Sequence, residues 1–118
     1  NVLSGELEGL SRLTNVRELQ LQENLFKMCP SEVFSLKEIR TLLLSHNQLR
    51  TLPDEIAHLR LCERLDISDN NLVSLTDAIC RMFNLKFVTV DNNYIRTLPS
   101  IAALTALETL SVVANRLH

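Results

Sequence analysis

The 118-residue sequence predicts an α/β solenoid. We expect one parallel sheet of about five short strands on a concave face, backed by short 3₁₀, helical or extended segments on a convex face. The first support is a period of 22 or 23 residues, marked by Asn24, Asn47, Asn70, Asn93 and Asn115. A constant apolar frame precedes each of these Asn residues, and apolar positions alternate with period two inside it. Together these observations predict a single repeat domain over residues 1–118.

The apolar frame before each Asn predicts a short strand. In one copy Ile39, Leu42 and Leu44 precede Asn47 at the spacing apolar-x-x-apolar-x-apolar-x-x-Asn. Residues two apart in a strand point to the same side, so Leu42 and Leu44 both point inward. One such strand cannot bury its apolar side alone, and stacked copies therefore form a parallel sheet. We place the strands near residues 18–22, 41–45, 64–68, 87–91 and 109–113.

The second half of each repeat predicts the convex side. One copy carries Leu52 and Pro53, followed three residues later by Ile56. Proline is unfavourable inside a long helix, so we expect turns, extended segments and brief 3₁₀ or helical turns. The last copy lacks one residue of this pattern, between Pro99 and Ile101. Asn1 lies in phase with the later Asn residues, and we interpret the N-terminal segment as the end of a preceding repeat.

These five copies in register resemble the leucine-rich repeat family, and the resemblance covers essentially the whole chain. The Leu-Pro-x-x-Ile half resembles the intracellular 23-residue class, which includes Ras-group scaffolds and Scribble-like polarity proteins. The shortened last copy is similar to the 22-residue repeats of a regulatory subunit of type-1 protein phosphatase. The resemblance implies a horseshoe fold in which a partner protein binds the concave face.

The recurring Asn is predicted to hold the fold rather than a ligand. It follows core Leu positions, which implies burial, and a buried amide must be hydrogen bonded. Its side chain offers two donors and an acceptor, enough to bond the backbone of its own turn and of the adjacent repeat. We therefore assign the five Asn residues of the repeat a structural role.

The outward face of the sheet is where we expect a partner to bind. The strand positions between the inward apolar residues form three columns across the five strands. The first column is Glu18, Thr41, Arg64, Phe87 and Thr109. The second column is Gln20, Leu43, Asp66, Thr89 and Ser111. The third column is Gln22, Ser45, Ser68, Asp91 and Val113.

Three apolar residues interrupt this polar surface: Leu43, Phe87 and Val113. Binding hot spots favour apolar and aromatic anchors ringed by polar groups, but single exposed apolar residues are also ordinary on protein surfaces. Neighbouring charges either supply the polar rim of such a site or form a solvated mixed-charge face. The candidate protein-binding residues are Leu43, Arg64, Asp66, Phe87, Thr89, Asp91 and Val113.

Composition argues against several other functions. The net charge is −2 and no run of basic residues is present, so nucleic-acid binding has little electrostatic support. The apolar runs are too short to cross a bilayer, so we expect no membrane insertion. His58 and Cys62 have a spacing that suits a metal, but Cys62 occupies an inward core position. No phosphate-binding loop or nucleophile elbow occurs, and we expect neither a cofactor nor an enzyme.

The three cysteines indicate a reducing, cytoplasmic location. Their number is odd, and Cys29 and Cys62 fall at core positions of the repeat, where a free thiol packs as a small apolar group. Disulfides are rare in such compartments, so we expect no disulfide framework.

Three functions remain open from the sequence. The chain is a recognition module of a scaffold or regulator, a structural subunit held permanently in a large assembly, or the targeting segment of a larger enzyme. Solenoids need polar terminal caps, and neither end of this sequence supplies one. We therefore expect a fragment of a longer array, or end-to-end packing against further repeats or neighbouring subunits.

Overall fold

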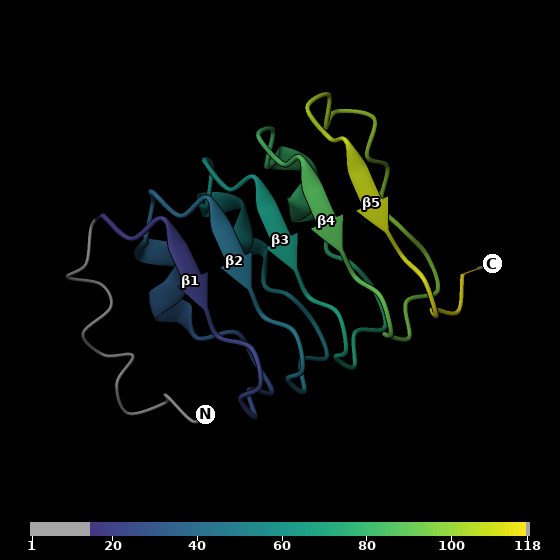
Figure 1. The fold of residues 1–118 in the computed structure, drawn as a ribbon. Coiled ribbons are helices and arrows are strands. Elements are labelled where there is room, and N and C mark those ends of the chain that lie inside the picture. Colours follow the sequence, from purple (N-terminus) through teal and green to yellow (C-terminus); the bar gives the residue numbers. More distant parts are fainter. Residues whose placement is uncertain (1–14, 118) are drawn as a thin grey trace.

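The computed structural model describes residues 15–117 and shows a solenoid with one sheet of five parallel strands (Figure 1). The strands lie side by side in the order in which they occur in the chain. They are β1 (Glu18–Gln20), β2 (Thr41–Leu43), β3 (Arg64–Asp66), β4 (Phe87–Thr89) and β5 (Thr109–Ser111). The predicted fold class is confirmed. Asn1, which the repeat places in phase with the later Asn residues, lies outside the described residues.

The register of the sheet follows the period of the sequence. Thr41 pairs with Arg64, and Arg64 pairs in turn with Phe87, so equivalent positions of successive repeats are neighbours. The middle residue of each inner strand points into the core and is almost fully buried, as at Leu42 and Leu65. The two outer residues of every strand therefore share the opposite, concave face.

The strands are shorter than the five residues predicted for each. Hydrogen bonds between repeats continue past the strand ends, for example from the Leu44 amide to the Asp66 carbonyl at 2.8 Å. The extended geometry nevertheless stops, because the residue before each repeat Asn has a left-handed backbone with φ between 56° and 59°. These turn residues are Glu23, His46, Asp69, Asn92 and Ala114. The turn redirects the chain from the sheet to the next side of the solenoid.

Short 3₁₀ helices form the convex side. They are η2 (Ser31–Ser35), η3 (Asp54–His58) and η4 (Asp77–Arg81). Proline precedes the first two helices, and Thr76 replaces it before η4, where its hydroxyl oxygen accepts a hydrogen bond from the Ala78 amide. This confirms the expectation of brief turns instead of long helices.

The last repeat differs from the others on the convex side. Residues 99–104 form a turn and irregular backbone rather than a 3₁₀ helix. This repeat lacks one residue after Pro99, and a shorter connection leaves less chain for a five-residue helix.

The repeat Asn side chains connect adjacent turns in the interior. Asn70 donates from Nδ2 to the carbonyl oxygens of Ile67 in its own repeat, at 3.1 Å, and of Leu44 in the preceding one, at 3.0 Å. Its Oδ1 accepts a hydrogen bond from the Leu49 amide at 3.0 Å. Asn47 and Asn93 repeat this arrangement. The side chain of each of these Asn residues thus accepts a hydrogen bond from a backbone N–H group that has no partner in a strand or helix.

The two ends of the Asn column are less complete. Asn115 keeps the same set of bonds but is half-buried. Asn24 is buried and donates to its own turn, while its Oδ1 has no partner among residues 15–117. The position that the repeat would place opposite this oxygen is Leu3, outside the described residues.

The core cysteines should resist alkylation in the folded protein. Burial, together with the charge of Glu32, raises the pKa of the Cys29 thiol to about 12, and burial raises the pKa of Cys62 to about 12. Cys80 is half-buried, and burial also raises its pKa. Because the thiolate is the reactive form, iodoacetamide at pH 8 should modify Cys80 first, as read by peptide mass spectrometry. All three thiols should react in denaturant, and equal native labelling of Cys29 and Cys80 would contradict this burial.

The same pKa values set a pH dependence of stability. The ordinary thiol pKa is 9.0, so above this pH the unfolded chain loses protons that the folded core retains. The stabilisation is complete below pH 9 and is lost as the pH rises from 9 towards about 12.

Candidate protein-binding face

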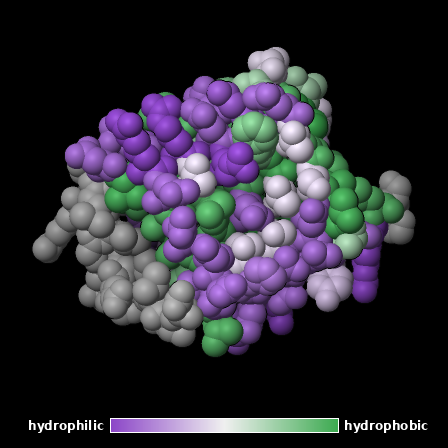
Figure 2. Space-filling model, in the orientation of Figure 1, coloured by the Kyte–Doolittle hydropathy of each residue, from purple (hydrophilic) through white to green (hydrophobic). Residues whose placement is uncertain are grey.

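The concave side of the sheet is left uncovered by the rest of residues 15–117 (Figure 1). The 3₁₀ helices all back the sheet from one side, and no other segment of residues 15–117 crosses the opposite side (Figure 1). Figure 2, in the same orientation, shows mainly hydrophilic surface interrupted by separate hydrophobic patches. A partner that reaches the strands therefore meets polar side chains with apolar groups between them.

A stacked pair occupies the centre of this face. The guanidinium carbon of Arg64 on β3 lies 4.6 Å from the ring centroid of Phe87 on β4. Phe87 is half-buried and Arg64 is exposed, so the cation covers part of the ring that would otherwise face solvent. This cation–π contact holds the guanidinium in place over the aromatic surface. The sequence placed both residues in one column but did not predict that they touch.

Two aspartates of the face are tied into the sheet. One oxygen of Asp66 accepts hydrogen bonds from the hydroxyl and the amide of Ser68, at 2.7 and 3.0 Å. One oxygen of Asp91 accepts from the Ser111 hydroxyl and the Val113 amide, both at 2.7 Å. The second oxygen, Oδ2, of each carboxylate has no hydrogen bond among residues 15–117 and remains available to a partner.

The three apolar candidates do not merge into one patch. Leu43 lies on β2 and Phe87 on β4, so β3 separates them by about 10 Å at the usual strand spacing. Val113 follows β5 and is 67% exposed, whereas Leu43 and Thr89 are half-buried. The structure therefore brings Arg64 and Phe87 together and keeps the other apolar side chains apart.

Ion pairs line the edge of the sheet where the strands begin. Glu63 lies between two cations, 2.9 Å from Arg40 Nη1 and 3.7 Å from Lys86 Nζ. These residues are 23 apart in the chain, and that spacing of opposite charges is the sequence signal that would have predicted the cluster. Such exposed pairs contribute little to stability, at most about 1 kcal/mol each.

The other edge of the sheet is acidic. The segments 20–23, 43–46, 66–69, 89–92 and 111–114 contain no Lys or Arg. Their charged residues are carboxylates, together with His46, whose Nε2 lies 3.5 Å from Asp69 Oδ2. The carboxylates are Glu23, Asp66, Asp69 and Asp91. The concave face is thus polarised across the strands, from a mixed edge with Arg and Lys to an acidic edge.

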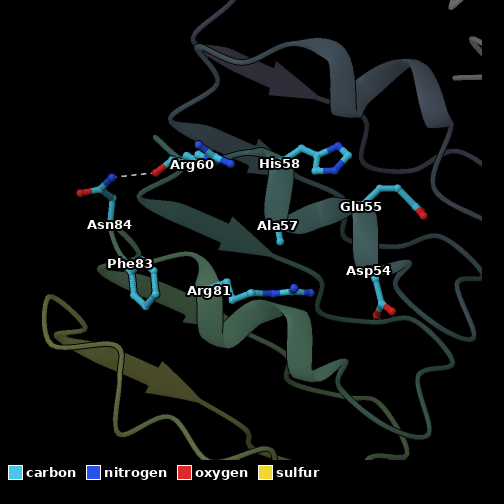
Figure 3. A pocket seen from close by; sticks show the side chains of 8 residues that line it. All are labelled: Asp54, Glu55, Ala57, His58, Arg60, Arg81, Phe83 and Asn84. Carbon is cyan, nitrogen blue, oxygen red and sulfur yellow. Dashed lines mark hydrogen bonds between the residues drawn. The ribbon is translucent and has the colours of Figure 1, made fainter.

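A hollow of 870 Å³ opens on the convex side between η3 and η4 (Figure 3). Asp54 and Glu55 stand on one side of it, while Arg60 and Asn84 stand on the other, and the side-chain Nδ2 of Asn84 donates to the Arg60 carbonyl at 2.7 Å. Phe83 is 58% exposed at its rim. Charged side chains of both signs therefore surround this hollow.

A family model described as a leucine-rich repeat region matches residues 4–117. The chain belongs to the leucine-rich repeat family. Domains of this family generally act in protein interaction and typically carry no catalytic site. The match supports a recognition surface and leaves the partner unidentified.

Two solved structures resemble this leucine-rich repeat chain. One is a leucine-rich repeat protein of Leptospira interrogans, with 35% identity and a TM-score of 0.87 over 92% of this chain. The other is from the Toll–Spatzle complex of Drosophila, with 22% identity and a TM-score of 0.81 over 93% of this chain, which shows likeness of fold alone. This chain spans 28% and 15% of those two chains. No curated protein sequence matches it.

Two further features of the leucine-rich repeat chain concern residues 15–117. None of the helices has the length and apolar content needed to cross a bilayer. His, Cys, Asp and Glu side chains do not gather there in groups of three or more that suit a metal ion.

Proposed function

We propose that this leucine-rich repeat chain is a protein-recognition module that binds its partner on the concave face of the sheet. The observation that carries the proposal is the Arg64–Phe87 stack, a prearranged cationic and aromatic group at the middle of an open sheet. Arg and aromatic residues dominate binding hot spots, and a prearranged pair loses less conformational entropy on binding.

The charges beside the stack define the partner's chemistry. The free carboxylate oxygens of Asp66 and Asp91 favour Lys or Arg side chains on the partner. An apolar or aromatic side chain of the partner would pack against Phe87 within the same contact. The proposed partner therefore presents an apolar group flanked by basic residues.

The size of the face suggests that this chain supplies part of a larger contact. Five strands at about 4.8 Å spacing span roughly 20 Å, which gives an area on the order of 400 Å². A standard protein interface needs about 800 Å² from each partner. The Leptospira relative is much longer than this chain, in keeping with a binding surface shared among more repeats.

We also propose an intracellular location and a role as a scaffold or regulator. Three features support it: the Leu-Pro-x-x-Ile pattern of the convex side, the free thiols of Cys29 and Cys62 in the core, and the free thiol of Cys80. Buried unpaired thiols persist most readily in a reducing compartment.

The proposal is tested by replacing Phe87 with Glu. The variant should lose its partner in affinity purification from the source cells, with binding weakened about tenfold or more, because a carboxylate replaces the aromatic anchor. Phe83→Glu is the matched control, since Phe83 lies in the same repeat, is exposed on the convex side and receives the same substitution. Both variants should melt close to the wild type.

The two variants separate the alternatives. Loss of the partner in Phe87→Glu alone supports the concave face. A partner set that survives Phe87→Glu but is lost in Phe83→Glu would move the contact to the convex hollow and refute the proposal.

A further inference from the structure

A second surface of the solenoid differs from the concave face in its residue composition. After each left-handed turn the chain runs down one side of the molecule, and backbone hydrogen bonds join successive repeats there. The Asn71 amide donates to the Leu49 carbonyl at 2.8 Å, and the Tyr94 amide to the Leu72 carbonyl at 2.8 Å. We call this surface the lateral face, and it consists of residues 25–27, 48–50, 71–73, 94–96 and 116–117.

Side chains point alternately inward and outward along each segment of the lateral face. Leu49, Leu72 and Ile95 point inward and are fully buried. The residues on either side of each point outward, and most of them are exposed. The 23-residue period then stacks the outward residues of each repeat beside those of the next.

The lateral face carries only positive charge. It contains four cations and no carboxylate, namely Lys27, Arg50, Arg96 and Arg116. All four are exposed, and none belongs to an ion pair formed within residues 15–117. Unpaired cations of one sign on adjacent repeats produce a positive local potential although the chain as a whole has a net charge of −2.

Apolar groups interleave with these cations. Val73 stands between Arg50 and Arg96 in the stack and is exposed, as is Tyr94. A hollow of 550 Å³ lies among Arg50, Thr51, Asn71, Val73 and Tyr94. The Arg116 guanidinium carbon lies 4.8 Å from the centroid of the Tyr94 ring, which holds this cation against one of the residues that line the hollow.

We propose that the lateral face is a second docking site, which binds an acidic protein segment carrying an apolar or aromatic side chain. The carboxylates of the segment pair with Arg50, Arg96 and Arg116, and its apolar side chain enters the hollow beside Val73 and Tyr94. Arginine suits this role because its planar fork binds a carboxylate through two hydrogen bonds.

Charge and shape favour a peptide over other polyanions. Proteins that bind nucleic acid strongly neutralise about 6–10 phosphates, more than the four cations present here. An anionic membrane needs a broad basic surface, whereas the adjacent turns carry Glu23 and Asp69. The hollow between repeats offers a place for an apolar side chain, which would give a peptide a fixed register.

The lateral site is expected to bind a different partner, because the lateral face is positive whereas one edge of the concave face is acidic. The partner proposed for the concave face presents basic residues to Asp66 and Asp91, whereas the lateral partner presents acidic ones. A scaffold with both surfaces holds two different proteins at once. Phe87→Glu should therefore leave lateral binding unchanged, so that failure of one proposal does not count against the other.

The test measures fluorescence anisotropy of a labelled peptide in which one Phe stands between two short runs of Glu. Arg50→Glu combined with Arg96→Glu should weaken its binding about tenfold or more, and added salt should weaken it for the wild type. Arg60→Glu combined with Arg81→Glu is the matched control, because it makes the same charge change at exposed, unpaired convex positions. A thermal melt of each variant checks that it folds.

Several outcomes overturn the proposal. One is an equal loss of peptide binding in the lateral double variant and in the convex double variant, which would show that binding depends only on the net charge of the protein. Another is equally tight binding of a peptide that has Ala in place of Phe, which would show that the hollow has no role in binding. A third is tighter binding of a single-stranded oligonucleotide or of phosphatidylserine vesicles, with the same dependence on Arg50 and Arg96. Selective loss in the lateral variant, with the Phe required, supports it.

Discussion

Replacing Leu65 with Ala is expected to lower the free energy of unfolding by about 2–5 kcal/mol. Leu65 is the middle residue of β3 and has no exposed surface. Leu42 and Val88, its partners in the neighbouring strands, are buried beside it, so the cavity left by Ala has little room to collapse. The cost combines the lost transfer of apolar atoms from water with the lost contacts around the cavity.

The Leu65 prediction is checked by urea unfolding followed by circular dichroism. Leu61→Ala is the control, because Leu61 is 38% exposed and receives the same substitution. Its expected cost is below about 1 kcal/mol. Similar losses of unfolding free energy in the two variants would show that Leu65 does not lie in the packed core of the array. Since each repeat contacts only its neighbours, a second transition in Leu65→Ala would indicate that the repeats on either side of β3 have uncoupled.

Asn70→Ala is expected to cost on the order of 1–3 kcal/mol, chiefly through one orphaned donor. The carbonyl oxygens of Leu44 and Ile67 keep a hydrogen bond after the substitution, because each also accepts from the Asn of an adjacent repeat, Asn47 or Asn93. The Leu49 amide loses the acceptor that it has in the folded chain. Burying an unpaired amide is therefore the main penalty.

The neighbouring residue supplies the control for Asn70. Asn71 is exposed, and its side chain makes no hydrogen bond among residues 15–117, so Asn71→Ala should change the melting temperature little. Differential scanning calorimetry of the two variants separates the effects. An unchanged melt for Asn70→Ala would contradict a structural role for the Asn column.

Much of the fold was predictable because each repeat restates the same pattern. The alternation at Leu42 and Leu44 indicated which side of the strand faces the core, and the period indicated which residues are neighbours in the sheet. Thr41, Arg64 and Phe87 accordingly stack in the predicted column. A single copy of the pattern would have been ambiguous, and agreement among five copies removed that ambiguity.

The strand ends and the last convex segment were predicted less well. The predicted strands were two residues too long, because side-chain alternation continues through positions where the backbone already leaves the extended conformation. The left-handed turn before each Asn is made by Glu, His, Asp, Asn and Ala, which share no turn signature. In this chain the hydrogen bonds of the following Asn, rather than the identity of the turn residue, stabilise that turn.

The sequence by itself determined the class of fold, the sheet order and the list of residues on the concave face, because these depend only on period and alternation. Tertiary structure alone decided which of those residues interact. Arg64 covers Phe87, and Asp66 and Asp91 each commit one oxygen to the sheet, through rotamers and distances that no periodicity encodes. The lateral face shows the same division. Its cations are one or two repeats apart in the chain and form no basic run, yet stacking of the repeats gathers them on one surface with Val73 and Tyr94.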